Sequence, residues 1–231
     1  MESSSRFRDG FVAALPIMIG YLPIAFSFGV AATRAGLTPF EAFALSLIIY
    51  AGASQFLALA LFTSGAPVLL AAFTLIAMNL RHVLYGPALM RAAKDTANPT
   101  GETRHAWAWA FGLTDEVFGQ ALGSLARGTR FSESYMFGLG LGAYASWLFG
   151  TALGAVTGAG ALEGWPSVSA GLGFTLPALF LALLLSLTTR RQLPVIVGAG
   201  AVTILATVAI GATSGILLGM LAGAALGLVR R

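Results

Sequence analysis

The chain has 231 residues, of which 57% are hydrophobic, 29 are glycine and only 10% are charged, and it contains no cysteine. Soluble domains average about 25% charged residues, so this composition excludes a soluble monomer, a disordered chain, a disulfide scaffold and thiol redox chemistry. The net charge is +4, but the 13 basic residues are scattered between apolar stretches. They therefore indicate membrane topology and not a nucleic-acid surface.

Six apolar runs are long enough to cross a hydrocarbon core about 30 Å thick. They cover residues 10–32, 66–90, 134–157, 166–188, 193–210 and 212–229. The first run follows Arg6 and Arg8 in the manner of a secretory signal, but it is too long for one. It also contains Pro16 and Pro23. We therefore interpret it as a retained transmembrane helix that is broken by its prolines.

Two further runs, 41–62 and 105–126, are long enough to cross the membrane but carry polar residues at their centres. In the first run these are Ser54 and Gln55, and in the second they are Thr114, Asp115 and Glu116. Each run is either a full span or a re-entrant hairpin. The sequence thus predicts an all-α polytopic membrane protein with six to eight spans, organised as a single integral membrane transporter domain over residues 1–231.

The distribution of basic residues bears on the topology. If both polar-centred runs are re-entrant, every loop arginine and lysine except Arg34 lies on the same side as the N-terminus. If both runs cross, Arg34 and the basic residues of the polar loop 91–104 lie on the other side. The positive-inside rule favours the first arrangement. Both arrangements place the N-terminal segment 1–9 and the C-terminus in the cytoplasm.

Small residues recur every fourth position in two of the runs. The first ridge comprises Gly138, Gly142, Ser146, Gly150, Gly154 and Gly158, and the second comprises Gly211, Gly215, Gly219, Gly223 and Gly227. Such ridges let helix backbones approach closely within lipid. Each ridge is interpreted as internal packing or, alternatively, as a surface that docks another subunit.

Charged residues occur near the centres of two runs. Arg81 lies close to the middle of 66–90, and the middle of 105–126 falls between Asp115 and Glu116. An ionised side chain at this depth costs about 2.5 to 3.5 kcal/mol on insertion scales, so these groups should pair or face water. The simplest arrangement pairs Arg81 with one carboxylate and leaves the other free to take a proton. Interrupted segments with polar groups near the bilayer centre are typical of secondary-transporter sites.

Less specific interpretations of these polar residues stay open. Asn79, Ser54 and Gln55 are also suited to hydrogen bonds between helices, and Arg81 with Asp115 to a static ion pair. An enzyme is not expected, because the sequence has no HExxH motif and no GxSxG motif. Two histidines and no cysteine also leave little to bind a metal, so we expect neither a metal site nor a cofactor. A non-transporting scaffold would have little need for polar clusters at one depth.

Four short motifs in the sequence point to a particular protein family. They are Phe7–Gly10, Tyr50–Phe56, Asn79–His82 followed by Tyr85 and Gly86, and Leu113–Glu116. In their order and over nearly the whole length, the chain resembles the AzlC family, the large subunits of branched-chain amino acid exporters. The resemblance implies secondary export of leucine, isoleucine and valine across the cell inner membrane. It also implies a small AzlD-type membrane subunit as partner. The sequence itself contains no nucleotide-binding motif, which is consistent with secondary transport.

The substrate site is expected among the polar and aromatic residues of these motifs: Tyr50, Ser54, Gln55, Phe56, Asn79, Arg81, His82 and Tyr85. Asp115 and Glu116 are the expected ion-coupling residues, with the proton as the coupled ion. A zwitterionic amino acid needs a cationic and an anionic partner, and Arg81 with one carboxylate supplies both; Phe56, Tyr50 and Tyr85 suit its aliphatic side chain. Amino acid and membrane lipid are thus the expected partners, and nucleic acid is not. The alternative is a transporter or channel for another small solute.

Overall fold

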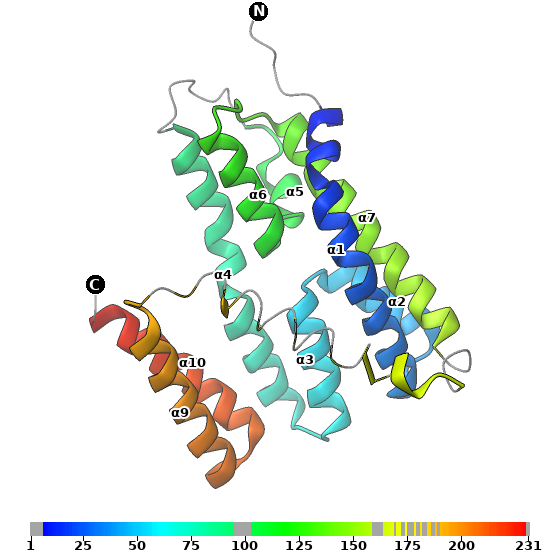
Figure 1. Cartoon of the computed structure of the whole chain (residues 1–231), viewed down its shortest axis with the longest axis vertical. Helices are drawn as coiled ribbons and strands as arrows, with labels where there is room; N and C mark the ends of the chain where they lie inside the picture. Colours follow the sequence, from blue (N-terminus) through cyan, green and yellow to red (C-terminus); the bar gives the residue numbers. More distant parts are fainter. Residues whose placement is uncertain are drawn as a thin grey trace, which may run out of the picture. The chain divides into compact units, whose positions relative to one another are not determined.

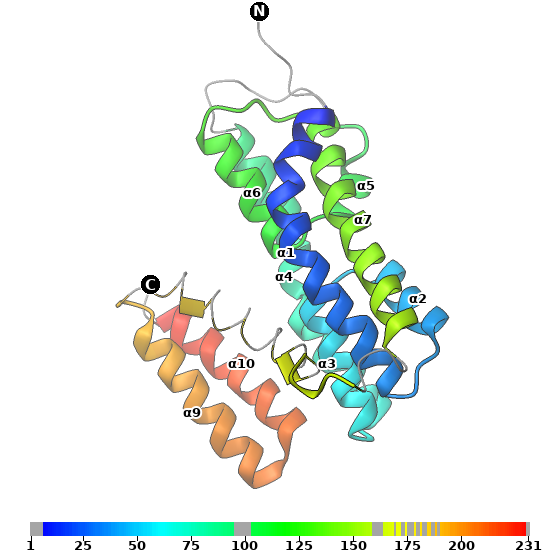
Figure 2. The same ribbon diagram turned by 45° about the vertical axis from the view of Figure 1, so that its right-hand side comes forward.

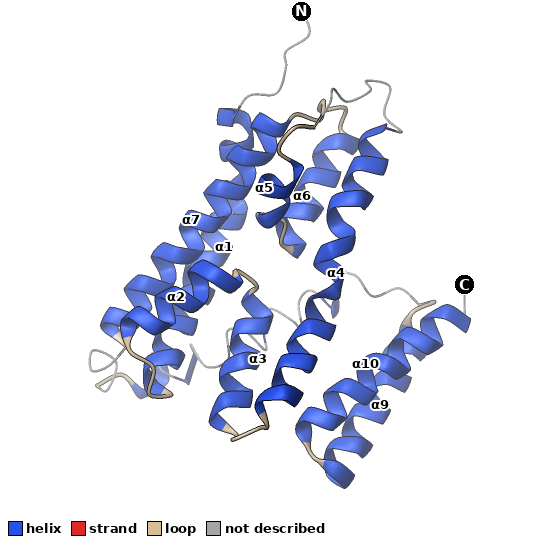
Figure 3. Ribbon diagram, turned by 180° about the vertical axis from the view of Figure 1, so that it is seen from behind, coloured by secondary structure: helices blue, strands red, loops and turns tan. Residues whose placement is uncertain are grey.

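The computed structural model describes residues 7–94, 103–158 and 190–229, together with thirteen of the residues between 164 and 188. In this part of the chain the regular secondary structure is α-helix without strands (Figure 3). The described residues belong to two compact units, Met1–Phe56 with Met78–Thr175 and Leu57–Ala77 with Leu176–Arg231. Most of the expected span 166–188 and of the polar loop 91–104 lies outside the described residues, as does most of the N-terminal segment 1–9.

Among the described residues, five helices are long and apolar enough to cross a membrane. They are α1 (Phe7–Arg34), α4 (Val68–Lys94), α7 (Glu133–Thr157), α9 (Leu193–Ile210) and α10 (Ala212–Val229) (Figure 1). Five of the six expected spans are thus confirmed as helices. Large apolar side chains on these helices are widely exposed, as lipid-facing residues are.

The expectation that prolines break the first span is wrong. Helix α1 runs without interruption through Pro16 and Pro23. Proline is tolerated in a transmembrane helix when a neighbouring helix supports the backbone. Helix α7 packs along α1, and Ser146 donates a hydrogen bond of 2.7 Å to the carbonyl oxygen of Met18, between the two prolines.

Helices α1 and α7 lie side by side and run in the same direction (Figures 1 and 2). The first glycine ridge forms this contact. A Cβ atom at Gly138 would overlap the carbonyl oxygen of Phe7, and one at Gly154 would overlap that of Phe26. Only glycine permits such close backbone contact, which also places the middles of the two helices together. The internal-packing interpretation of this ridge is therefore confirmed.

The run 41–62 is two short helices, α2 (Pro39–Ile49) and α3 (Gly52–Thr63). Thr38 and Glu41 cap the start of α2 reciprocally, and α2 ends at Tyr50, which has left-handed backbone angles with φ of 37°. Gln55 in α3 donates a hydrogen bond of 2.8 Å to Ser46 in α2. A continuous helix would separate these residues by about 13 Å, so the run folds back on itself as a hairpin.

The run 105–126 is likewise two short helices, α5 (Ala106–Phe111) and α6 (Asp115–Ala126). The backbone amide of His105 donates to Glu133 at 2.7 Å, and Ser124 lies 2.8 Å from the hydroxyl of Tyr135, so both outer ends of the run lie at the start of α7. The turn between the helices lies further along α7, where Gly112 approaches Gly140 and Phe111 contacts Tyr144. This run is therefore a hairpin as well (Figure 3).

The second unit contains α9 and α10, which pack against each other through the second glycine ridge. Gly215 faces Thr207, and Gly219 faces Thr203. Gly211 joins the two helices with φ of 107°, a value that side chains other than hydrogen rarely tolerate. This ridge also packs within the chain. The notion that residues 1–231 form one transporter domain stays a prediction.

Candidate functional site

The tips of the two hairpins meet beside the middle of α7. The ring of Tyr50, at the tip of α2–α3, lies 6.1 Å from that of Phe111 in α5 and 4.7 Å from that of Tyr144 in α7. Ser46, nearer the base of the first hairpin, contacts Thr151, further along α7. The first hairpin thus approaches from the C-terminal end of α7 and the second from its N-terminal end. Both interruptions thus come together beside Tyr144.

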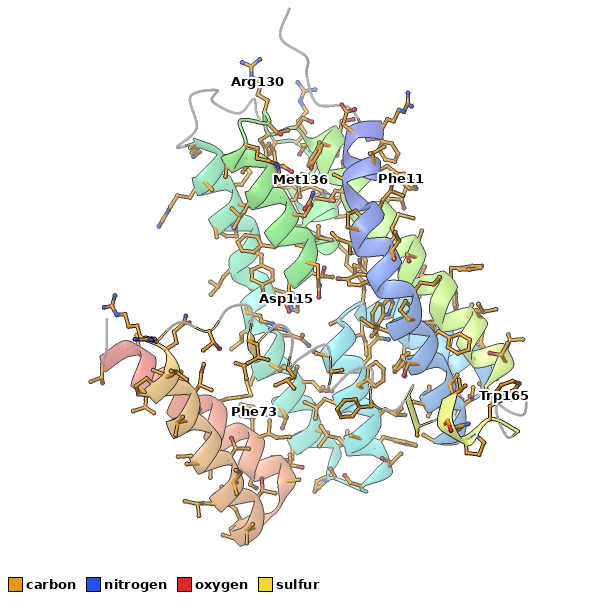
Figure 4. The ribbon with its side chains drawn as sticks, in the orientation of Figure 1. Phe11, Phe73, Asp115, Arg130, Met136 and Trp165 are labelled. Carbon is orange, nitrogen blue, oxygen red and sulfur yellow. The ribbon has the colours of Figure 1, made fainter. Side chains whose placement is uncertain are left out.

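A charged cluster lies at the start of α6. Nη2 of Arg81 is 2.8 Å from Oδ2 of Asp115, and the hydroxyl of Tyr85 donates a hydrogen bond to Oδ1 of the same carboxylate. The side chains of Arg81 and Asp115 are 41% and 33% exposed, so the pair is open to a ligand or water. Figure 4 labels Asp115 at this end of α6. Of the two candidate carboxylates, Asp115 is the one paired with Arg81.

Glu116 has a different partner. The hydroxyl of Tyr21, in the middle of α1, donates a hydrogen bond of 2.5 Å to Oε2 of Glu116. Because that hydroxyl has one hydrogen, Thr114, whose Oγ1 lies 2.5 Å away, is the donor in the second contact. Thr114 also caps α6 by accepting from the amide of Val117. In the described part of the chain, Glu116 is thus held by the hydroxyl of Tyr21, which Thr114 supports, and not by an arginine.

Gln55 lies in a fully buried network. Its amide oxygen accepts a hydrogen bond of 2.9 Å from the indole of Trp147, and its amide nitrogen donates to Ser46, which in turn bonds to Thr151. Gln55, Ser46 and Thr151 are all 0% exposed. This network fastens the first hairpin to α7. It therefore supports the interpretation of Gln55 as a contact between helices.

The other expected site residues surround these groups. Ser54 donates a hydrogen bond of 2.7 Å to Asn79, joining α3 to α4. His82 lies edge-on to Tyr85, with ring centroids 5.3 Å apart. Phe56 lies edge-on to Phe28. All the expected site residues belong to the first compact unit.

Two buried polar atoms of the described residues have no hydrogen-bond partner, namely the hydroxyl of Tyr50 and Nε of Arg81. A buried donor left unsatisfied costs about 1 to 3 kcal/mol. Tyr50 is also the one non-glycine residue with positive φ in the described part of the chain. Strained backbone and unsatisfied polar atoms commonly accompany functional sites.

Sequence reasoning missed Tyr21, Trp147, Tyr144 and Phe111, which lie in apolar helices where an aromatic residue usually indicates packing. A buried tyrosine or tryptophan needs a partner for its polar atom, and this was the available signal. Phe111 and Tyr144 also border a half-open apolar cavity of about 120 Å³ between α5 and α7. No group of three metal-ligating side chains occurs among the described residues.

Comparison with known proteins shows which family the sequence matches. Residues 16–160 match the family model described as AzlC protein. The inner membrane protein YgaZ of Escherichia coli is 44% identical over 94% of this chain and 89% of its own length. An uncharacterized membrane protein of Archaeoglobus fulgidus is 38% identical over 88% of this chain and 86% of its own. The branched-chain amino acid transport protein AzlC of Bacillus subtilis is 25% identical over 78% and 66%. No solved structure matches.

Proposed function

The chain belongs to the AzlC family, and from this premise we propose that it is the large subunit of a secondary exporter of branched-chain amino acids. One relative carries the name of a branched-chain amino acid transport protein. The observation in this chain that supports the proposal is the meeting of two opposed hairpins beside the charges of Arg81, Asp115 and Glu116.

A zwitterionic substrate fits the charges at the hairpin tips. Arg81 is engaged by Asp115 through Nη2 but keeps Nε unpartnered, so it has a donor for the substrate carboxylate. Glu116, which no arginine neutralises among the described contacts, is suited to the substrate ammonium group. The aromatic rings of Phe56 and Tyr85 stay the proposed contacts of the aliphatic side chain.

Glu116 is also the proposed coupling residue. Asp115 is paired with Arg81, whereas the described contact of Glu116 is the hydroxyl of Tyr21, so Glu116 is the carboxylate to which we assign the coupled proton. A proton and a substrate ammonium group then compete for Glu116. Because one site binds either cation but not both, inward movement of a proton drives outward movement of the amino acid through alternating access.

The proposed topology follows from the hairpins. If neither hairpin crosses the membrane, the helices and the expected span 166–188 give six crossings with both termini in the cytoplasm. This arrangement places every loop arginine and lysine except Arg34 on the inner side. We place the protein in the cell inner membrane, together with a small AzlD-type subunit.

Export from preloaded cells tests the function. Radiolabelled valine and leucine are followed in cells that express this chain alone, the chain with its neighbouring small subunit, and the pair with Arg81→Ala. Arg91→Ala is the matched control, because Arg91 lies on the same helix and is exposed near its end. Export should require both chains and be lost with Arg81→Ala but not with Arg91→Ala, at equal membrane levels. If no combination exports either amino acid, the cargo is another small solute.

A further inference from the structure

The hydroxyl of Tyr50 is the feature that packing does not explain. The side chain is 5% exposed, and its ring is enclosed by Phe111 and Tyr144. Its hydroxyl is buried and bonds to nothing in the described part of the chain, whereas the neighbouring Tyr144 donates to the carbonyl oxygen of Leu47 at 2.6 Å. Phenylalanine would fill the same space without leaving a polar atom unsatisfied.

Contacts around the hairpin tips relate this hydroxyl to Glu116. Tyr50 occupies the tip of the first hairpin, two residues before Gly52, which packs against the ring of Trp147. The ring of Trp147 lies edge-on to that of Tyr21, with centroids 5.2 Å apart, and Tyr21 in turn bonds to Glu116. Tyr21 engages Oε2 of Glu116, which leaves Oε1 as an acceptor. The unpartnered hydroxyl of Tyr50 and the carboxylate of Glu116 thus both belong to the region where the hairpin tips meet.

We propose that the hydroxyl oxygen of Tyr50 and Oε1 of Glu116 together bind the ammonium group of the amino-acid substrate. This assignment rests on the proposed function and deepens it, because it gives Tyr50 a polar role in place of the expected apolar one. An ammonium group has three N–H donors and no acceptor, so it satisfies both oxygens at once. A substrate carboxylate would instead be repelled by Glu116.

The test compares two ligands that differ only in the ammonium group. Binding of leucine and of 4-methylpentanoate, which lacks that group, is measured by calorimetry on the purified full-length chain and on Tyr50→Phe. We expect Tyr50→Phe to weaken leucine binding about tenfold, as for loss of one hydrogen bond to a charged group, and to leave 4-methylpentanoate binding unchanged. Tyr50→Phe should at the same time unfold at an equal or higher temperature, because it removes an unsatisfied hydroxyl.

Tyr144→Phe is the matched control. It removes the hydroxyl that bonds to Leu47, so it should lower the unfolding temperature without changing the ratio of leucine to 4-methylpentanoate affinity. The proposal is wrong if Tyr50→Phe binds leucine as tightly as the wild type, or if both ligands weaken by the same factor. If the wild-type chain binds no leucine, either alone or with its small partner, the proposed function itself fails and this assignment fails with it.

Discussion

Arg81 and Asp115 form an ion pair of 2.8 Å between the middle of α4 and the first residue of α6. Tyr85, one helical turn after Arg81, donates to the same carboxylate. Asp115 is thus bound twice from one helix, while the adjacent Glu116 turns to Tyr21 on α1. The start of α6 therefore directs two consecutive carboxylates to two different helices.

The first prediction distinguishes a substrate-binding arginine from a static ion pair. Asp115→Asn should lower leucine export at least about tenfold, because it leaves Arg81 uncompensated at membrane depth. The double variant Arg81→Gln with Asp115→Asn removes both charges and should restore normal membrane levels. We expect it to remain inactive in the export assay, because no cation is left for the substrate carboxylate. Recovery of export in the double variant would show that the pair is structural.

The second prediction concerns proton coupling. Glu116→Gln cannot exchange a proton, so leucine counterflow in proteoliposomes should lose its dependence on pH and on an imposed proton gradient. It should also show a higher KM, because the amide carries no charge for the ammonium group. Normal pH-dependent counterflow by Glu116→Gln would remove this carboxylate from the mechanism.

The third prediction tests the buried network around Gln55. Gln55→Leu leaves the indole N–H of Trp147 without its acceptor and should lower the free energy of unfolding by about 2 kcal/mol or more. Thermal unfolding in detergent measures this change, and Gln120→Leu, at a half-buried position on α6, is the control. Active Gln55→Leu protein should retain the wild-type KM for leucine. A raised KM with unchanged stability would instead make Gln55 a substrate ligand.

The fourth prediction concerns the contact between α1 and α7. A Cβ atom at Gly154 would overlap the backbone of Phe26, whereas one at Gly20 meets nothing within 4 Å. Gly154→Ala should therefore destabilise the protein by about 1 to 3 kcal/mol through overpacking, and Gly20→Ala should not. The unfolding temperature of the two purified variants makes the comparison. Equal temperatures would contradict the close packing of these helices.

The fifth prediction concerns topology. The natural chain has no cysteine, so a single introduced cysteine reports its own side of the membrane. Asn98→Cys should react with an impermeant maleimide only from the cytoplasmic side, because α1 crosses outward, the first hairpin returns to the side that it left and α4 crosses back. Ser64→Cys, between α3 and α4, should react only from the opposite side. Labelling of Asn98→Cys from outside would contradict this topology, because the chain would then cross the membrane a different number of times before residue 98.

Much of the architecture was available from local sequence properties. Apolar run length predicted α1, α4, α7, α9 and α10, because crossing a membrane imposes length and hydrophobicity on each helix by itself. The glycine ridges predicted close packing, because their spacing along one helix is visible in the sequence and small residues let helix backbones approach. The prolines of α1 misled, since their effect depends on the support that α7 provides from elsewhere in the chain.

By itself, the sequence determined that the chain is an apolar helical protein with charged residues, such as Arg81 and Glu116, near the middle of long apolar runs. Composition and position within a run follow from residue order alone. Only the tertiary structure decided that the polar-centred runs fold back as hairpins, that Arg81 pairs with Asp115 and not with Glu116, and that Gln55 is enclosed. These choices depend on which helices lie beside one another. A hydrogen bond between residues about a hundred positions apart, such as that from Tyr21 to Glu116, leaves no local pattern in either segment.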